Sequence, residues 1–214
     1  MYKEKEIVDR PNLSEQLNDR EIAIKMLLGT IPGEDSEREG LKETPHRVAM
    51  MYEELFGGYE MDPIAILSKT FDAGKMHDEE VESDAGIYVN GLVIVKDIPF
   101  FSHCEHHMVP FVGKVSIAYV PGERVVGLSK LARLVECFAR RLQIQERLTN
   151  QIADAIKDVL KPEGVMVIVQ AEHLCMTMRG IKKPGAKTVT SSVSGIFTTN
   201  NAARAEVLSL IEIK

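Results

Sequence analysis

The sequence predicts an α+β protein in which an antiparallel four-stranded sheet carries two antiparallel helices on one face. Two observations lead to this fold class. Short runs rich in β-branched residues, one of them clearly alternating, predict strands at residues 92–95, 114–120, 165–170 and 187–193. Between the second and third runs, apolar residues recur at helical spacing in two segments. The order strand–strand–helix–helix–strand–strand is typical of such a sheet with a helix pair.

The two central helices are each predicted from one apolar stripe. The first follows Leu128, and its stripe consists of Leu131, Leu134, Val135, Phe138 and Leu142. The second begins near Gln145, and its buried side consists of Leu148, Ile152, Ile156, Val159 and Leu160. The residues "KPEG" at 161–164 end that helix. A terminal helix is expected from about Asn201.

An N-terminal helical region, residues 1–60, is expected before a second domain, residues 61–214, which contains the predicted sheet. Ile22, Met26 and Leu27 share one helical face. A second helix starts at "TPHRV", residues 44–48, with proline in its first turn, and Gly57 and Gly58 end it. The polar segment 72–84 is expected to be a loop.

Composition excludes several classes of protein. The 214 residues carry a net charge of -6, which argues against a general nucleic-acid or membrane binder but allows a local basic pocket. The N-terminus lacks the apolar stretch of a secretory signal, and no apolar run could span a bilayer. Three cysteines, at 104, 137 and 175, make a poor disulfide framework and favour the cytoplasm.

The stretch "FSHCEHHMVP", residues 101–110, suggests a metal site. Cys104 and His107 form a C-x-x-H pair, and thiolate and imidazole are ligands that zinc prefers. Glu105 is not expected to be a ligand beside these softer donors. Taken alone, the cluster is equally compatible with a loop whose histidines hydrogen-bond their own backbone.

A third ligand is predicted from residues 171–179. If this segment is extended, His173, Cys175, Thr177 and Arg179 line one face, and Leu174, Met176 and Met178 line the other as core. The polar face makes Cys175 a ligand candidate. Cys137, within a helix beside the apolar stripe, is expected to be a small buried hydrophobe.

Three protein ligands leave the fourth tetrahedral position to water, which is typical of a catalytic zinc. The alternative is a structural site closed by His103 or His106. Neighbouring side chains diverge on an extended backbone, so His106 and His107 are not expected to share one metal.

Other motifs are absent or ambiguous. No P-C-x-x-C follows, as a zinc deaminase requires, there is no H-E-x-x-H, and "GERVVGLSK" misses the phosphate-loop pattern. Ser129 and Lys130 at a helix start, with Arg133 one turn on, fit either an anion site or a solvated basic face. Arg179 favours a polyphosphate. Glu146 with Gln145 fits either a helix-dipole partner or a contact to a base edge such as guanine's.

Five motifs together resemble the GTP cyclohydrolase I family: "CEHH", "GLSKLARLVE", "RRLQIQERLT", "HLCMTMRG" and "KTVTSSVSGIF". The resemblance runs from about Thr44 to Phe197. It implies the tunnelling fold, a ring that is usually a homodecamer with active sites between subunits, and conversion of GTP and water to 7,8-dihydroneopterin triphosphate and formate. That reaction opens folate or tetrahydrobiopterin synthesis.

The resemblance also implies roles for individual residues. Zn²⁺ is held by Cys104, His107 and Cys175, and His106 and His173 are catalytic. In the family mechanism, zinc makes a hydroxide that attacks guanine C8, and His173 exchanges a proton at N7. His106 is expected to protonate the ribose ring oxygen. The substrate-binding residues are Glu146, which recognises guanine, and Gln145, Ser129, Lys130, Arg133, Arg179, Arg141 and Arg47.

Two other functions are considered as alternatives to zinc-dependent hydrolysis of GTP. One is an enzyme of the same fold without zinc hydrolysis, such as a nitrile-reducing enzyme of deazaguanine metabolism. It needs a nucleophilic cysteine without a metal pair, so the cysteines and His107 count against it. The other is a ring-forming scaffold whose zinc only stabilises the sheet.

Overall fold

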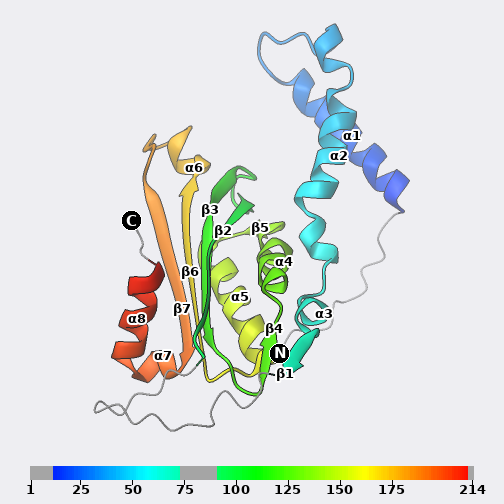
Figure 1. The fold of residues 1–214 in the computed structure, drawn as a ribbon. Coiled ribbons are helices and arrows are strands. Elements are labelled where there is room, and N and C mark those ends of the chain that lie inside the picture. The colour runs from blue at the N-terminus through cyan, green and yellow to red at the C-terminus, as the bar shows by residue number, and fades with distance from the viewer. Residues whose placement is uncertain (1–11, 73–90, 212–214) are drawn as a thin grey trace, which may run out of the picture. The chain divides into compact units, whose positions relative to one another are not determined.

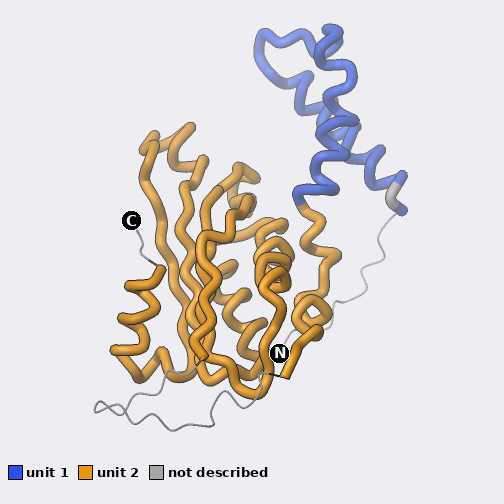
Figure 2. The backbone as a smooth tube through the Cα atoms, viewed as in Figure 1, with its two compact units in different colours: residues 1–55 blue, residues 56–214 orange. Residues whose placement is uncertain are grey.

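The computed structural model describes residues 12–72 and 91–211. The chain divides into two compact units, residues 1–55 and 56–214 (Figure 2). The functional boundary at residues 60 and 61 stays a prediction, because these units are defined by packing and not by activity. Beyond Asp72, the loop expected at 72–84 lies outside the described residues. No helix in the described ranges combines the length and apolarity needed to cross a membrane.

The first unit contains helix α1 (Leu13–Gly29), a 3₁₀ turn η1 (Glu39–Leu41) and helix α2 (Thr44–Leu55). The side chain of Asn12 accepts from Glu15 N, and Asn12 N donates to Glu15 Oε2, so a capping box begins α1. Helix α2 begins where the sequence predicts it. On α1, the apolar face expected from Ile22, Met26 and Leu27 is exposed in the single chain.

The second unit contains a five-stranded sheet in the order β5-β2-β3-β6-β7 and a two-stranded sheet of β1 and β4 (Figure 1). Its strands are β1 (Thr70–Asp72), β2 (Val93–Cys104), β3 (Pro110–Val120), β4 (Arg124–Val126), β5 (Leu142–Gln143), β6 (Gly164–His173) and β7 (Lys187–Gly195). Its helices are η2 (Gly57–Glu60), α3 (Pro63–Leu67), α4 (Leu128–Ala139), α5 (Gln145–Leu160), α6 (Leu174–Thr177), α7 (Ile196–Thr199) and α8 (Asn201–Ile211).

The predicted fold class is confirmed. Strands β2, β3, β6 and β7 are the four predicted strands and pair antiparallel. The short β5 adds a parallel edge beside β2, which makes the sheet mixed. The predicted strand at 92–95 is shorter than β2, because the register of β2 shifts between Val95 and Ile98, where Asp97 adopts a φ of 61°. The strand continues beyond this irregularity to Cys104.

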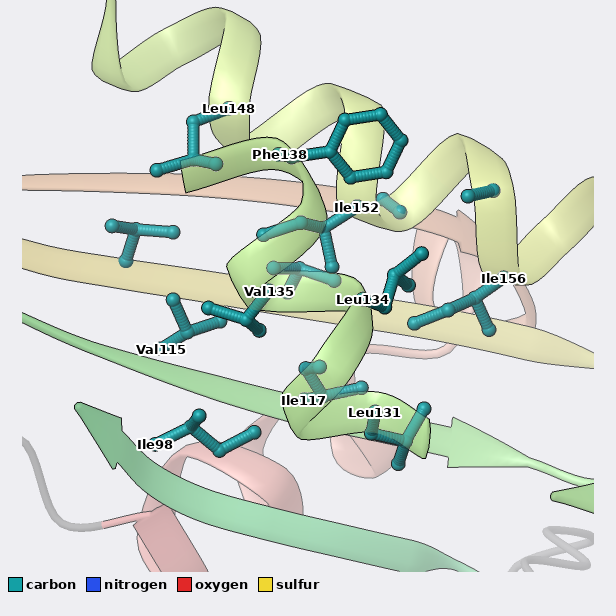
Figure 3. Packing of buried hydrophobic residues seen from close by; sticks show 14 of the residues in the cluster. Ile98, Val115, Ile117, Leu131, Leu134, Val135, Phe138, Leu148, Ile152 and Ile156 are labelled. Atoms are coloured by element: carbon teal, nitrogen blue, oxygen red, sulfur yellow. The ribbon is translucent and has the colours of Figure 1, made fainter. Parts of the chain in front are cut away.

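The apolar stripes of α4 and α5 pack on one face of the sheet (Figure 3). Leu134 and Ile152 from the two helices share this core with Val115 and Ile117 of β3, and all four are fully buried. Burying each such side chain contributes about 1.5–3 kcal/mol. Helix α8 belongs to a smaller cluster on the opposite face, through Ala203, Val207 and Ile211. The sheet and the helix pair form the frame that holds the candidate site.

Four segments meet at one end of this frame. Strand β2 ends and β3 begins there, since His103 pairs with Pro110. Strand β6 also ends there, since Phe111 pairs with His173. Strand β5 pairs with the end of β2 and leads directly into α5. The close approach of β3 and β6 requires Gly113, because a Cβ at this residue would lie 2.0 Å from Gln170 O.

Candidate active site

Cys104 and His107 lie on the tight turn between β2 and β3. His107 N and Met108 N both donate to Cys104 O, at 3.2 and 2.8 Å, and Cys104 N donates to Val109 O at 3.0 Å. Met108 adopts a φ of 53°, which closes the turn. The turn brings His107 Nδ1 to 3.6 Å from Cys104 Sγ. Cys104 is buried, whereas His107 is exposed.

Cys175 completes a three-residue cluster from a distant part of the chain. It lies on α6, directly after β6, and its Sγ and the ligand atoms of Cys104 and His107 all lie within 4.8 Å of one another. In a tetrahedral zinc site, sulfur and nitrogen ligands are separated by about 3.6 Å. The Cys104–His107 separation of 3.6 Å matches this edge. The donor set and its spacing therefore fit zinc.

The electrostatics of the two thiols favour a cation between them. Burial raises the pKa of the Cys175 thiol, and the neighbouring Cys104 thiol raises it further, while Arg179 lowers it. Two adjacent thiols resist ionising together unless a positive charge stabilises them. A divalent metal supplies that charge and binds both as thiolates.

His106 lies beside the cluster but not in it. Its Nδ1 is 3.7 Å from Cys104 Sγ, yet the set of atoms within 4.8 Å of one another contains His107 and not His106. The premise that residues 106 and 107 are extended is wrong, because the backbone here is a turn. That the two histidines do not share a metal stays a prediction. Glu105 forms a bidentate ion pair with Arg147 of α5, and this pair lowers the pKa of Glu105.

His173, the last residue of β6, is held on two sides. Its Nε2 lies 2.8 Å from Gln145 Oε1, and its ring stacks on Phe111 with centroids 4.6 Å apart and planes 3° apart. Burial lowers the pKa of His173, and the nearby Glu146 carboxylate partly opposes this shift. The half-buried ring therefore favours its neutral form. Glu146 itself is exposed in the first turn of α5.

The extended strip predicted for residues 173–179 is wrong. The chain turns into α6 at Leu174, so alternate residues do not share a face. Met176 and Met178, expected in the core, are 37% and 64% exposed. Thr177 Oγ1 donates to Leu174 O within this helical turn. Cys175 therefore joins the cluster from a helix, whereas its role as a ligand is predicted from an extended segment.

The predicted anion-binding residues at the start of α4 do not lie beside the cluster within one chain. Ser129, Lys130 and Arg133 lie at the start of α4, which follows β4 at the opposite end of the sheet (Figure 1). At 1.5 Å per residue, Lys130 lies about 14 Å along the helix from Ala139, the residue nearest the cluster end. Arg179 is exposed near Cys175.

The two remaining arginines have other surroundings. Arg141 donates from Nε to Cys137 O at 2.6 Å, and its guanidinium lies over the rings of Tyr59 and Phe138. Arg47 is exposed on α2, in the first compact unit. Cys137 is fully buried, as the sequence predicts.

Sequence reasoning missed several residues of the site. Arg147 was not singled out, and neither was Phe111, which pairs with His173 across β3 and β6. No local signal identifies these two partners, since each is far from its contact in sequence. His103, considered only as an alternative fourth ligand, is 5% exposed and contacts the ring of Phe56 edge-on. Its Nδ1 has no hydrogen-bond partner among the described residues.

Comparisons with known proteins agree with the site. The family model described as GTP cyclohydrolase I matches residues 20–212, so the likeness begins earlier than the expected residue 44. GTP cyclohydrolase 1 of Carboxydothermus hydrogenoformans is 56% identical over 192 residues, 89% of this chain and 92% of that protein. GTP cyclohydrolase 1 of Halalkalibacterium halodurans is 56% identical over 191 residues, 89% of this chain and 94% of that protein.

A third relative, GTP cyclohydrolase 1 of Desulforamulus reducens, is 57% identical over 192 residues, 89% of this chain and 95% of that protein. Among solved structures, the archaeosine synthase QueF-Like in the apo form matches with a TM-score of 0.40 and 19% identity, over 49% of this chain and 94% of that chain. That structural likeness is too weak to carry an argument.

Proposed function

We propose that this chain, which belongs to the GTP cyclohydrolase I family and has that activity, converts GTP and water to 7,8-dihydroneopterin triphosphate and formate at the cluster of Cys104, His107 and Cys175. The observation that carries this proposal is the convergence of two thiols and an imidazole within 4.8 Å from segments about seventy residues apart. When bound there, zinc supplies a Lewis acid that makes water nucleophilic near neutral pH.

His173 is the proposed acid and base at purine N7. Its half-buried ring, held by Gln145 and Phe111, supports this role, because proton transfer requires a group at a fixed position. Its lowered pKa favours the neutral form, which can take up a proton and return it. His106, exposed and next to Glu105, is proposed to protonate the ribose ring oxygen.

Glu146 is the proposed guanine-binding residue, since an exposed carboxylate can accept from the N–H and amino groups of that base. The proposed triphosphate and ribose contacts are Ser129, Lys130, Arg133 and Arg179, with Arg141 and Arg47 as further candidates. Gln145 is proposed to act at this same pocket. All of these assignments come from the family resemblance and from the chemistry of the side chains.

Assembly into a ring, as a homodecamer, is part of the proposal. It is supported by the position of Lys130 at the far end of α4 from the cluster, because one chain alone separates these groups. A neighbouring copy would bring its own α4 start to the cluster. The exposed apolar face of α1 is a further surface that such an assembly could cover. The proposed location is the cytoplasm, where the three free cysteines stay reduced.

The test is to incubate the purified protein with GTP, with and without a zinc chelator, and to follow pterin fluorescence after oxidation together with formate. We expect product only without chelator, and its return when zinc is added back. The variant His173→Ala should fold, retain zinc and lose formate release. A metal-free protein with full activity would exclude the proposed role of zinc. Unfolding of Cys175→Ser, together with a His173→Ala variant that folds and shows no measurable change, would support a scaffold.

A further inference from the structure

The carboxamide of Gln145 has one possible orientation. The side chain is 1% exposed, and its Nε2 lies 3.0 Å from both Val169 O and Thr188 O. Backbone carbonyls only accept hydrogen bonds, so the NH₂ group must face them. Exchanging the nitrogen and oxygen would place an oxygen against two other oxygens in a buried place, which is strongly unfavourable.

Two hydroxyls reinforce this orientation. Thr149 Oγ1 donates to Gln145 O at 2.7 Å, so its hydrogen is used there. Thr190 Oγ1, 2.6 Å from Thr149 Oγ1, must therefore donate to Thr149, which leaves it to accept from Gln145 Nε2 at 3.1 Å. Every donor in this network has an acceptor, so both the backbone and the side chain of Gln145 are held by β6, β7 and α5.

The orientation of Gln145 determines the hydrogen on His173. Gln145 Oε1 can only accept, and it lies 2.8 Å from His173 Nε2. That nitrogen must carry a hydrogen, and Nδ1 is then the atom with the free lone pair in the neutral ring. Stacking on Phe111 fixes the plane of the same ring.

We propose that Gln145 is a positioning residue that holds His173 in the Nε2–H tautomer, so that Nδ1 is the atom that exchanges a proton with the substrate. This proposal rests on the proposed function. In the protonated ring both nitrogens carry hydrogen; when Nδ1 gives its proton to purine N7, the ring returns to the Nε2–H form. The Gln145 side chain then contributes through His173 and not by contact with guanine, in contrast to the role that the resemblance implies.

The test variant is Gln145→Met, which keeps the length of the side chain and removes its acceptor and donors. We expect kcat to fall about 10- to 100-fold, a part of the roughly 10²–10⁴-fold that general acid–base catalysis contributes, with KM for GTP changed less than about 2-fold. In a His173→Ala background, Gln145→Met should change neither kcat nor the equilibrium dissociation constant for GTP, because residues that act through one another are not additive. A large further loss of GTP affinity there would overturn the proposal.

Gln143→Met is the matched control. Gln143 is likewise buried, at 2% exposed, and its Nε2 donates to Phe138 O and Gln151 Oε1 at 2.9 and 2.7 Å. Its hydrogen bonds among the described residues do not include His173, and its Oε1 has no hydrogen-bond partner there. We expect a comparable loss of thermal stability and kcat within about 2-fold of the unmodified protein. Equal losses of kcat in both variants would show that buried amides matter only for the fold.

A readout independent of activity is the ¹⁵N NMR signal of His173 in zinc-loaded protein with labelled histidine, assigned with His173→Ala. We expect the Nε2–H tautomer in the unmodified protein and a mixture in Gln145→Met. An Nδ1–H tautomer in the unmodified protein would overturn the proposal, even if Gln145→Met does not fold. If the protein makes no pterin from GTP, the proposed function fails while this tautomer is still measurable.

Discussion

The two ends of helix pair α4 and α5 differ in how their candidate site residues are held. At the cluster end, Gln145 is buried and His173 is fixed by a hydrogen bond and a stacked ring. At the start of α4, Ser129 and Arg133 are exposed. Bond-making steps lose much of their rate when a group is displaced by an ångström, whereas long cations bind a polyphosphate over a range of positions. On the proposed function, only the cluster end then needs to be built within one chain.

The largest expected effect comes from breaking the cluster end with Cys175→Ala. Zinc should fall from about one ion per chain to nearly none, and GTP turnover should fall at least about 10³-fold, because water loses its activating metal. Metal analysis and formate release measure both. Cys137→Ala, which removes the cysteine that lies outside the cluster, should retain zinc and activity and lose about 1 kcal/mol of unfolding free energy. Zinc retained at full stoichiometry by Cys175→Ala would contradict the ligand assignment.

A mixing experiment sharpens the comparison between the two ends. His173→Ala and Lys130→Ala should each be nearly inactive alone. Unfolded together and refolded as mixed assemblies, they should regain up to roughly a quarter of the activity, the share of interfaces at which both contributing residues are intact. Mixing His173→Ala with Cys175→Ala, which alter the same end, should restore nothing. No recovery in the first mixture would place both groups in one chain.

A smaller effect is expected from Glu105→Gln. The Glu105–Arg147 ion pair ties the metal-binding turn to α5, so its loss should loosen the turn and lower zinc affinity about 10-fold. Titration against a competing chelator measures this. Asp97→Asn breaks the exposed Asp97–Lys114 pair, whose atoms are 3.1 Å apart, and should leave zinc affinity unchanged. An unchanged affinity in Glu105→Gln would remove the turn-anchoring role.

The smallest expected effect is the contribution of His103 to the pH dependence of stability. Burial lowers the pKa of His103, and the Arg140 charge lowers it further. Because the unfolded state binds this proton more readily, stability is complete above the unfolded pKa of about 6.5 and is lost as the pH falls from there toward the folded pKa. The loss of unfolding free energy from this one proton is at most about 1.4 kcal/mol per pH unit. The melting temperature of His103→Leu should therefore fall less between pH 7 and 5.5; an equal slope would contradict this.

The elements of the second unit were largely predictable. The apolar stripes of α4 and α5 recur every three to four residues, and the strands are rich in β-branched residues, so local pattern is sufficient. The extent of β2 was missed because a register shift interrupts its alternation. Helix α6 was missed because four residues are too short for a period to be seen.

The three residues of the cluster were predictable because only a few residue types bind zinc and the chain has just three cysteines. Local sequence determined the C-x-x-H turn, the capped helix starts and the choice of donor atoms. Only the tertiary structure decided that Gln145 is turned toward His173, that Arg147 holds Glu105, and that α4 begins far from the cluster. The physical reason is that these contacts depend on strand register and helix direction, which join residues that no local pattern connects.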